Sequence, residues 1–186
     1  MAVKAKNTKT TSKAVTEIDT PVEENVTEEQ AITDTPIETA NEEALDPDSH
    51  YKTLLVGQAQ SLSPKSNSRI GFELALNTQD KARYLRLTSN SNGGLFSKAW
   101  VSLDALFELL EQQEEDKPFK SSIFKTVIKG GSANNVSFLA AVCRCEEVGL
   151  ILKSEKNQFL HLINPLLINQ RDRLTKLKPL PTSAKK

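Results

Sequence analysis

The stretch SANNVSFLAAVCRCEEVGLILKSEKNQFLHLIN, which runs from Ser132 to Asn164, decides the predicted fold of this chain. Its first half repeats apolar residues at the spacing i, i+3, i+4, i+7, which lines up one stripe of a helix: Val136, Leu139, Ala140 and Cys143. Gly149 then stands where the C-terminus of a helix favours a left-handed backbone. Two short apolar runs follow, one on each side of the polar turn 154–157. The stretch is therefore predicted to form a helix over residues 133–148 and then a β-hairpin.

Two helices and a glycine turn are predicted directly upstream. The first helix follows Ser102, a residue type that caps helix N-termini, and Pro118 marks the break after the charged segment at its end. Its apolar residues again fall at helical spacing: Leu103, Leu106, Phe107 and Leu110. A second, short helix starts at Ser121 or Ser122, and Gly130-Gly131 turns the chain into the next helix. The apolar residues of the short helix are predicted to face inward: Ile123, Phe124, Val127 and Ile128.

The order of helix, helix, glycine turn, helix and hairpin resembles the winged helix-turn-helix superfamily. The segment EEVGLI, residues 146–151, adds to the resemblance because it stands between the last helix and the hairpin. The resemblance covers about residues 100–164. It implies a DNA-binding domain in which the helix 133–148 enters the major groove and the hairpin is the wing.

Three β-strands are predicted in residues 51–101, namely 51–60, 69–77 and 83–88. Residues 51–60 are of strand-favouring types, and apolar and polar residues alternate in 69–77 and 83–88, so we expect an antiparallel meander with one buried face. The outward face would show Lys52, Tyr84 and Arg86, which could contact a phosphate backbone but are also normal on a solvated sheet. The segment 89–94 (SNSNGG) lacks the lysine of a phosphate-binding loop and is predicted to be a turn. Trp100 is predicted to anchor the sheet against the helices, with stacking on a nucleic-acid base as the alternative.

Charge is divided unevenly along the chain, although the formal net charge is zero. Residues 14–50 hold twelve acidic residues and no lysine or arginine. Four of the 24 basic residues precede them, so residues 51–186 hold 20 basic and 12 acidic residues, a net charge of +8. A basic domain beside an acidic segment is typical of nucleic-acid binders, while an excess spread over solvated surface is the alternative.

The fold class is therefore predicted as α+β, an antiparallel β-meander followed by a winged helix-turn-helix, with a disordered acidic N-terminal tail. Residues 1–49 are predicted to be this tail, because so few apolar residues cannot offset the entropy of ordering. The tail could compete with nucleic acid, bind a protein partner or only solubilise the chain. Residues 50–178 are predicted to be one domain, 51–101 the meander and 102–164 the winged helix-turn-helix. Residues 179–186 are predicted to be disordered.

Residues for DNA recognition are predicted on the helix 133–148 and around it. A helical wheel places Asn134, Ser137 and Arg144 in one arc about 80° wide, away from the apolar stripe. Asparagine can pair with adenine and arginine with guanine in the major groove, and lysines can bind the flanking phosphates. The predicted DNA-binding residues are Lys125, Lys129, Asn134, Asn135, Ser137, Arg144, Lys153 and Lys156.

The same helix carries a second apolar face, formed by Phe138, Val142 and Cys145. It could therefore be covered by a second subunit or by the meander and serve protein contacts instead. After the hairpin, Pro165 at a helix N1 position opens a predicted basic helix within residues 165–178. This terminal helix could pair two copies into a homodimer or lie along DNA.

Catalytic or cofactor chemistry is not predicted. His50 and His161 lack metal-ligand spacing, and no nucleophile motif occurs. Cys143 and Cys145 are two residues apart on a helix, so they point to opposite faces and neither pair nor bind one metal. We expect them to be reduced thiols of a cytoplasmic protein, since no signal peptide or membrane span is visible.

Two functions are consistent with these patterns. The first is a non-enzymatic DNA-binding accessory or regulatory protein of the winged-helix type. The second is a protein interaction adaptor in a bacterial DNA-processing, transfer or defence assembly. The two differ in whether the helix 133–148 meets DNA or protein.

Overall fold

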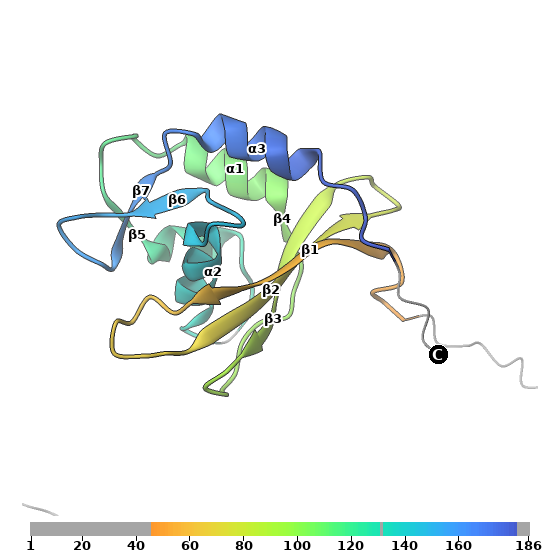
Figure 1. Ribbon diagram of the computed structural model, residues 1–186, viewed down its shortest axis with the longest axis horizontal. Helices are drawn as coiled ribbons and strands as arrows, with labels where there is room; N and C mark the ends of the chain where they lie inside the picture. The colour runs from red at the N-terminus through yellow and green to blue at the C-terminus, as the bar shows by residue number, and fades with distance from the viewer. Residues whose placement is uncertain (1–45, 131, 182–186) are drawn as a thin grey trace, which may run out of the picture. The chain divides into compact units, whose positions relative to one another are not determined.

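An antiparallel sheet of four strands forms one side of the core in the computed structural model, which describes residues 46–130 and 132–181 (Figure 1). Its strands lie in the order of the sequence: β1 (Tyr51–Gln60), β2 (Arg69–Asn77), β3 (Arg83–Asn90) and β4 (Val101–Ser102). The alternating pattern of β2 turns Ile70, Phe72 and Leu74 into the core, where each is at most 1% exposed. The predicted antiparallel meander is confirmed, with β3 two residues longer than expected.

Helices and a second, smaller sheet form the other side of the core. The elements are α1 (Leu103–Glu111), β5 (Phe119–Lys120), the 3₁₀ helix η1 (Ser121–Thr126), α2 (Asn135–Arg144), β6 (Ile151–Lys153), β7 (Leu160–Ile163) and α3 (Leu167–Thr175). Ser102 caps α1 as predicted, since its hydroxyl accepts the Ala105 N–H, and the predicted apolar stripe of α1 is buried. The predicted hairpin is β6-β7, and β5, which was not predicted from the sequence, pairs with β7. The described chain is therefore a mixed α+β fold, and every described residue belongs to one compact unit, Glu42–Lys186.

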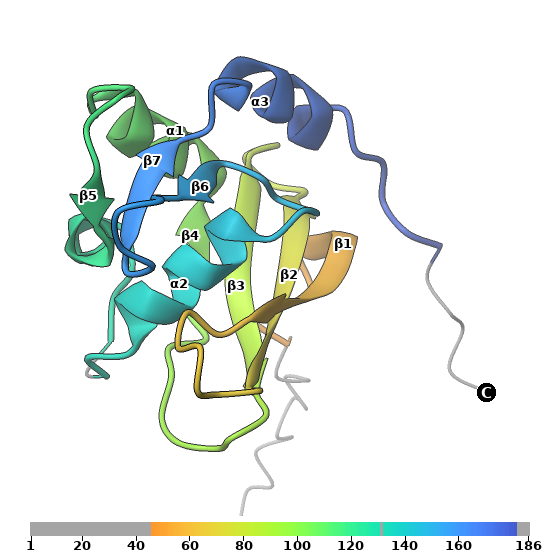
Figure 2. The same cartoon turned by 60° about the vertical axis from the view of Figure 1, so that its left-hand side comes forward.

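The helix α2 lies between the two sheets (Figures 1 and 2). It contacts β1 and β2 on one side and β6 and η1 on the other. Five consecutive residues, Leu139 to Cys143, are at most 2% exposed, and such a run covers more than one helical turn. No residue of α2 is exposed. Of the expected alternatives for this helix, the described structure shows contact with the meander, through β1 and β2.

Three helices differ from the predicted ones in where they begin or end or in their type. The helix predicted over 133–148 ends at Arg144, because Cys145 adopts an extended backbone. Gly149 has the predicted left-handed backbone, with φ +65°, but it closes a separate turn in which its N–H donates to the Cys145 carbonyl at 2.7 Å. The short second helix is a 3₁₀ helix. Pro165 lies before the N-cap residue Leu166 and is not the first residue of α3, as was predicted.

The predicted tails lie largely outside the described residues. Residues 1–45 and 182–186 are not described, so the predicted disorder of these segments is not addressed there. Residues 179–181 of the predicted C-terminal tail are described, and there the Leu180 N–H donates to the Thr53 carbonyl on β1 at 2.8 Å. Among the helices of the described ranges, none has the length and apolar character needed to cross a bilayer.

Candidate functional site

Two of the eight residues predicted to bind DNA hold the protein itself together. Asn135 is 2% exposed, and its side-chain oxygen accepts the N–H of Ser97 at 2.9 Å. The nitrogen of the same amide, Nδ2, is buried and has no hydrogen-bond partner among the described residues. Because the α2 backbone and the loop around Ser97 enclose this amide, the prediction that Asn135 reads a base in the major groove is wrong.

Arg144 is the second of these internal residues. Its guanidinium donates to the carbonyl oxygens of Gln158 at 3.0 Å and Leu160 at 3.1 Å, and to Nδ1 of His161 at 2.7 Å. These three bonds join the end of α2 to the β6-β7 hairpin. Three of its five N–H donors are bound to acceptors within the fold, and its Nε is buried without a partner among the described residues, so the guanidinium is held inside the fold and is not free to read guanine as predicted.

His161 and Ser121 form the arrangement closest to a catalytic pair in the described chain. His161 is fully buried, and its Nε2 lies 2.8 Å from the Ser121 hydroxyl. A guanidinium has donors only, so Nδ1 must accept from Arg144 and Nε2 must carry the ring proton. Nε2 therefore donates to Ser121 and cannot take its proton, which a nucleophilic serine requires. Burial, with the Arg144 charge, lowers the pKa of His161 to about 4, so the ring is neutral at pH 7.

The two cysteines are free thiols. Cys143 is buried and Cys145 is half-buried, and burial raises the pKa of both, that of Cys145 to about 12. Neither thiol is a thiolate at neutral pH, which is the reactive form. Within residues 46–130 and 132–181, no three His, Cys, Asp or Glu side chains gather where they could hold a metal ion.

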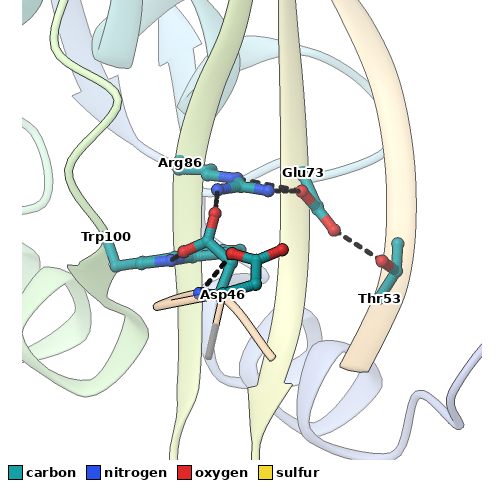
Figure 3. Close-up of polar contacts among 6 residues, drawn as sticks. Asp46, Thr53, Glu73, Arg86 and Trp100 are labelled. Carbon is teal, nitrogen blue, oxygen red and sulfur yellow. Dashed lines mark hydrogen bonds and ion pairs between the residues drawn. The ribbon is translucent and has the colours of Figure 1, made fainter. Parts of the chain in front are cut away.

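The solvent-facing side of the large sheet carries an ion-pair network (Figure 3). Arg86 forms ion pairs with Asp48 and, at 2.8 Å, with Glu73, while Thr53 donates to Glu73 at 2.5 Å. Tyr84, another residue considered for phosphate contact on this face, donates its hydroxyl to the carboxylate of Asp80 in the turn before β3. Of the three residues considered there, Arg86 and Tyr84 are thus occupied by carboxylates, and the side chain of Lys52 remains exposed.

Trp100 completes this network on the outer side of the sheet. Tyr51 stacks on its ring with centroids 4.1 Å apart, and the Arg86 guanidinium lies 4.2 Å from the ring centroid. The indole N–H donates to Asp48 at 2.9 Å, and this bond, together with those of Arg86, lowers the pKa of Asp48. Trp100 therefore anchors the turn before β1 to the outer face, whereas the sequence indicated a contact between sheet and helices.

The other predicted residues stay at the surface. Asn134 is exposed at the N-cap of α2 with no side-chain capping bond, and Ser137 is half-buried. The predicted lysines are exposed, and so is Lys120, which lies on β5 and was not among the predicted DNA-binding residues. Its position in the sequence shortly before Lys125 and Lys129 indicated that it could share their surface. We call the following set the lysine face: Lys120, Lys125, Lys129, Lys153 and Lys156.

The lysine face occupies one end of the described unit. The hairpin tip, β5 and η1 lie beside each other in both views of the ribbon (Figures 1 and 2), and β5 is hydrogen-bonded to β7. No carboxylate among the described residues is within ion-pair distance of these lysines. By contrast, five of the six arginines donate to acceptors inside the described unit: Arg83, Arg86, Arg144, Arg171 and Arg173. The face thus offers positive charge without internal neutralisation.

Comparisons with protein families, with characterised proteins and with solved structures find no match to this chain.

Proposed function

We propose that this chain is a non-enzymatic DNA-binding accessory or regulatory protein of the winged-helix type. The observation that carries the proposal is the lysine face, whose five charges are exposed and have no carboxylate partner in the described chain. Lysines in such a position bind phosphate groups and release the counterions of DNA, which supplies most of the affinity for the backbone.

The order of the elements supports the winged-helix type. The helix α1, the short helix η1, the glycine turn, the helix α2 and the hairpin β6-β7 follow in the sequence expected of that superfamily. The mode of contact differs, however, because α2 has no exposed face to enter a major groove. We infer that DNA lies across η1, the N-terminal end of α2 at Asn134 and the hairpin tip.

Such an interface is expected to tolerate many DNA sequences. Arginine is the residue that most often reads guanine, through two parallel hydrogen bonds, and lysine acts as a point charge on phosphates. Because the arginine next to this surface, Arg144, is bound within the fold, backbone contacts dominate. We therefore expect strong dependence on salt and weak dependence on sequence.

The test is fluorescence anisotropy of the full chain with a labelled DNA duplex over a range of salt. A triple variant, Lys125→Gln, Lys129→Gln and Lys156→Gln, should bind more weakly, with a salt slope smaller by roughly 0.9 for each phosphate that the variant no longer neutralises. The matched control changes three exposed lysines outside the face, Lys65, Lys81 and Lys178, to Gln and should keep the slope. Equal slopes in both triple variants, or no binding at low salt, would refute the proposal.

A variant that is expected to bind DNA more tightly extends the same experiment. Glu155 is exposed at the hairpin tip between Lys153 and Lys156. Replacing it by lysine removes a repulsion and should strengthen binding and steepen the salt slope. The alternative function, a protein interaction adaptor, is favoured by a different surface at the start of α3, where Leu166 and Ile168 are 56% and 74% exposed.

A further inference from the structure

A hollow lined by both apolar and polar side chains lies between the end of α1 and the start of α3. It has a volume of about 240 Å³, and its apolar lining includes Leu110, Ile163 and Leu167, which belong to the hydrophobic core. Ile168 also lines it and is 74% exposed. An exposed isoleucine beside an opening onto core residues is unfavourable in water, so the hollow has the character of a binding site for an apolar side chain.

The rim of this hollow is acidic. Glu111 and Glu115 line it, and the end of α1 and the loop after it hold five acidic residues in a nine-residue span: Glu108, Glu111, Glu114, Glu115 and Asp116. Arg171 pairs with Glu111 at 2.7 Å and Lys117 with Glu114 at 2.8 Å. Glu115 has no basic partner within ion-pair distance among the described residues. The last turn of α1 also contains no basic residue, although the end of a helix favours cations.

We propose that this hollow is a docking groove for a basic segment of a partner protein. An apolar side chain of the partner enters between α1 and α3 and contacts Ile168, and flanking lysine or arginine side chains lie near Glu115. Charge complementarity selects this partner, because carboxylates around the hollow attract a basic segment and repel an acidic one. The groove is separate from the lysine face, so a partner and DNA can be bound by different residues of one chain.

The probe for the test is a short labelled peptide of lysine and alanine with one central leucine, measured by fluorescence anisotropy with the full chain. Two control peptides carry glutamate in place of lysine or alanine in place of leucine. We expect the basic peptide with leucine to bind most tightly, the one without leucine to bind more weakly and the acidic peptide not to bind. Equal affinity with and without the leucine would overturn the proposal, since the hollow would then contribute nothing.

Variants of the chain distinguish the groove from other acidic segments, in particular residues 14–50. Ile168→Ser combined with Glu115→Lys should weaken binding about tenfold or more, as expected when an anchor site is removed. The matched control, Leu152→Ser with Glu155→Lys, changes an exposed leucine and an exposed glutamate of the hairpin and should leave peptide affinity within about twofold. All four side chains are exposed, so both double variants should retain the thermal midpoint of the parent chain.

Two further outcomes would overturn the proposal. One is equal affinity in the two double variants, which would assign the binding to acidic residues elsewhere. The other is self-association that Ile168→Ser abolishes while no peptide binds, which would assign the groove to a second copy of the chain. Neither depends on DNA binding, and the triple lysine-to-glutamine variant of the lysine face should bind the peptide as the parent chain does.

Discussion

Replacing His161 by glutamine is expected to remove much of the acid sensitivity of this protein between pH 7 and pH 5. The buried ring is neutral in the folded state, with a pKa of about 4, and an unfolded histidine has a pKa of about 6.5. Below pH 6.5 the unfolded chain therefore binds a proton that the folded chain does not. The contribution of His161 to the free energy of unfolding is complete above pH 6.5 and falls as the pH drops towards 4.

The size of the effect follows from the two pKa values. With a pKa of about 4 in the folded chain and about 6.5 in the unfolded chain, the decrease in the free energy of unfolding between pH 7 and pH 5 is roughly 2 kcal/mol from this residue alone. Glutamine does not titrate, and its amide can accept from Arg144 and donate to Ser121, so the internal bonds can be retained. The variant is expected to be somewhat less stable at every pH but to show a flatter pH profile.

Urea unfolding followed by circular dichroism at pH 5, 6 and 7 measures this difference. Carboxylates titrate in both proteins alike, so subtracting the two profiles isolates the histidine. An equal fall in the free energy of unfolding between pH 7 and pH 5 in the parent chain and in His161→Gln would show that the ring is not held neutral in the fold.

Two predictions concern the core. Gly57→Ala should lower the free energy of unfolding by about 1–3 kcal/mol, because the new Cβ would lie 2.5 Å from Cζ of the buried Phe72 ring. The decrease is measured by urea unfolding, and an unchanged midpoint would mean that the ring moves freely. Leu139→Ala should cost about 2–5 kcal/mol, because this side chain is fully buried on α2 between the two sheets. A destabilisation below about 1 kcal/mol would contradict the packing of α2 on both sides.

Local periodicity explains what the sequence could predict of the fold. The strands β1 to β3, the helix α1 with its Ser102 cap and the β6-β7 hairpin all carry their pattern within about ten residues of sequence. Strand β5 carries none, since its two residues, Phe119 and Lys120, become a strand only by pairing with β7 some forty residues later. The end of α2 was misplaced because Gly149 has the expected backbone but closes a turn beyond the helix.

The candidate site was less predictable for a related reason. A helical wheel shows which residues share a face, but it does not show what covers that face. The partner of Asn135 comes from the loop at Ser97, and the partners of Arg144 come from residues 158–161, so neither could be deduced from α2 alone. The second apolar face of α2 was the signal for burial. The exposure of the lysines could be predicted from the residue type alone, because lysine is rarely buried.

The single hydrogen bond from Leu180 to β1 has a consequence for association between molecules. A long strand at the edge of a sheet is a template on which foreign strands can add, which leads to aggregation. Leu180 stands between Pro179 and Pro181, and proline has no N–H, so this segment can donate at one position and cannot continue a ladder. The C-terminal segment thus covers the start of the edge at Thr53 with an irregular segment whose two prolines offer a further strand no N–H donor.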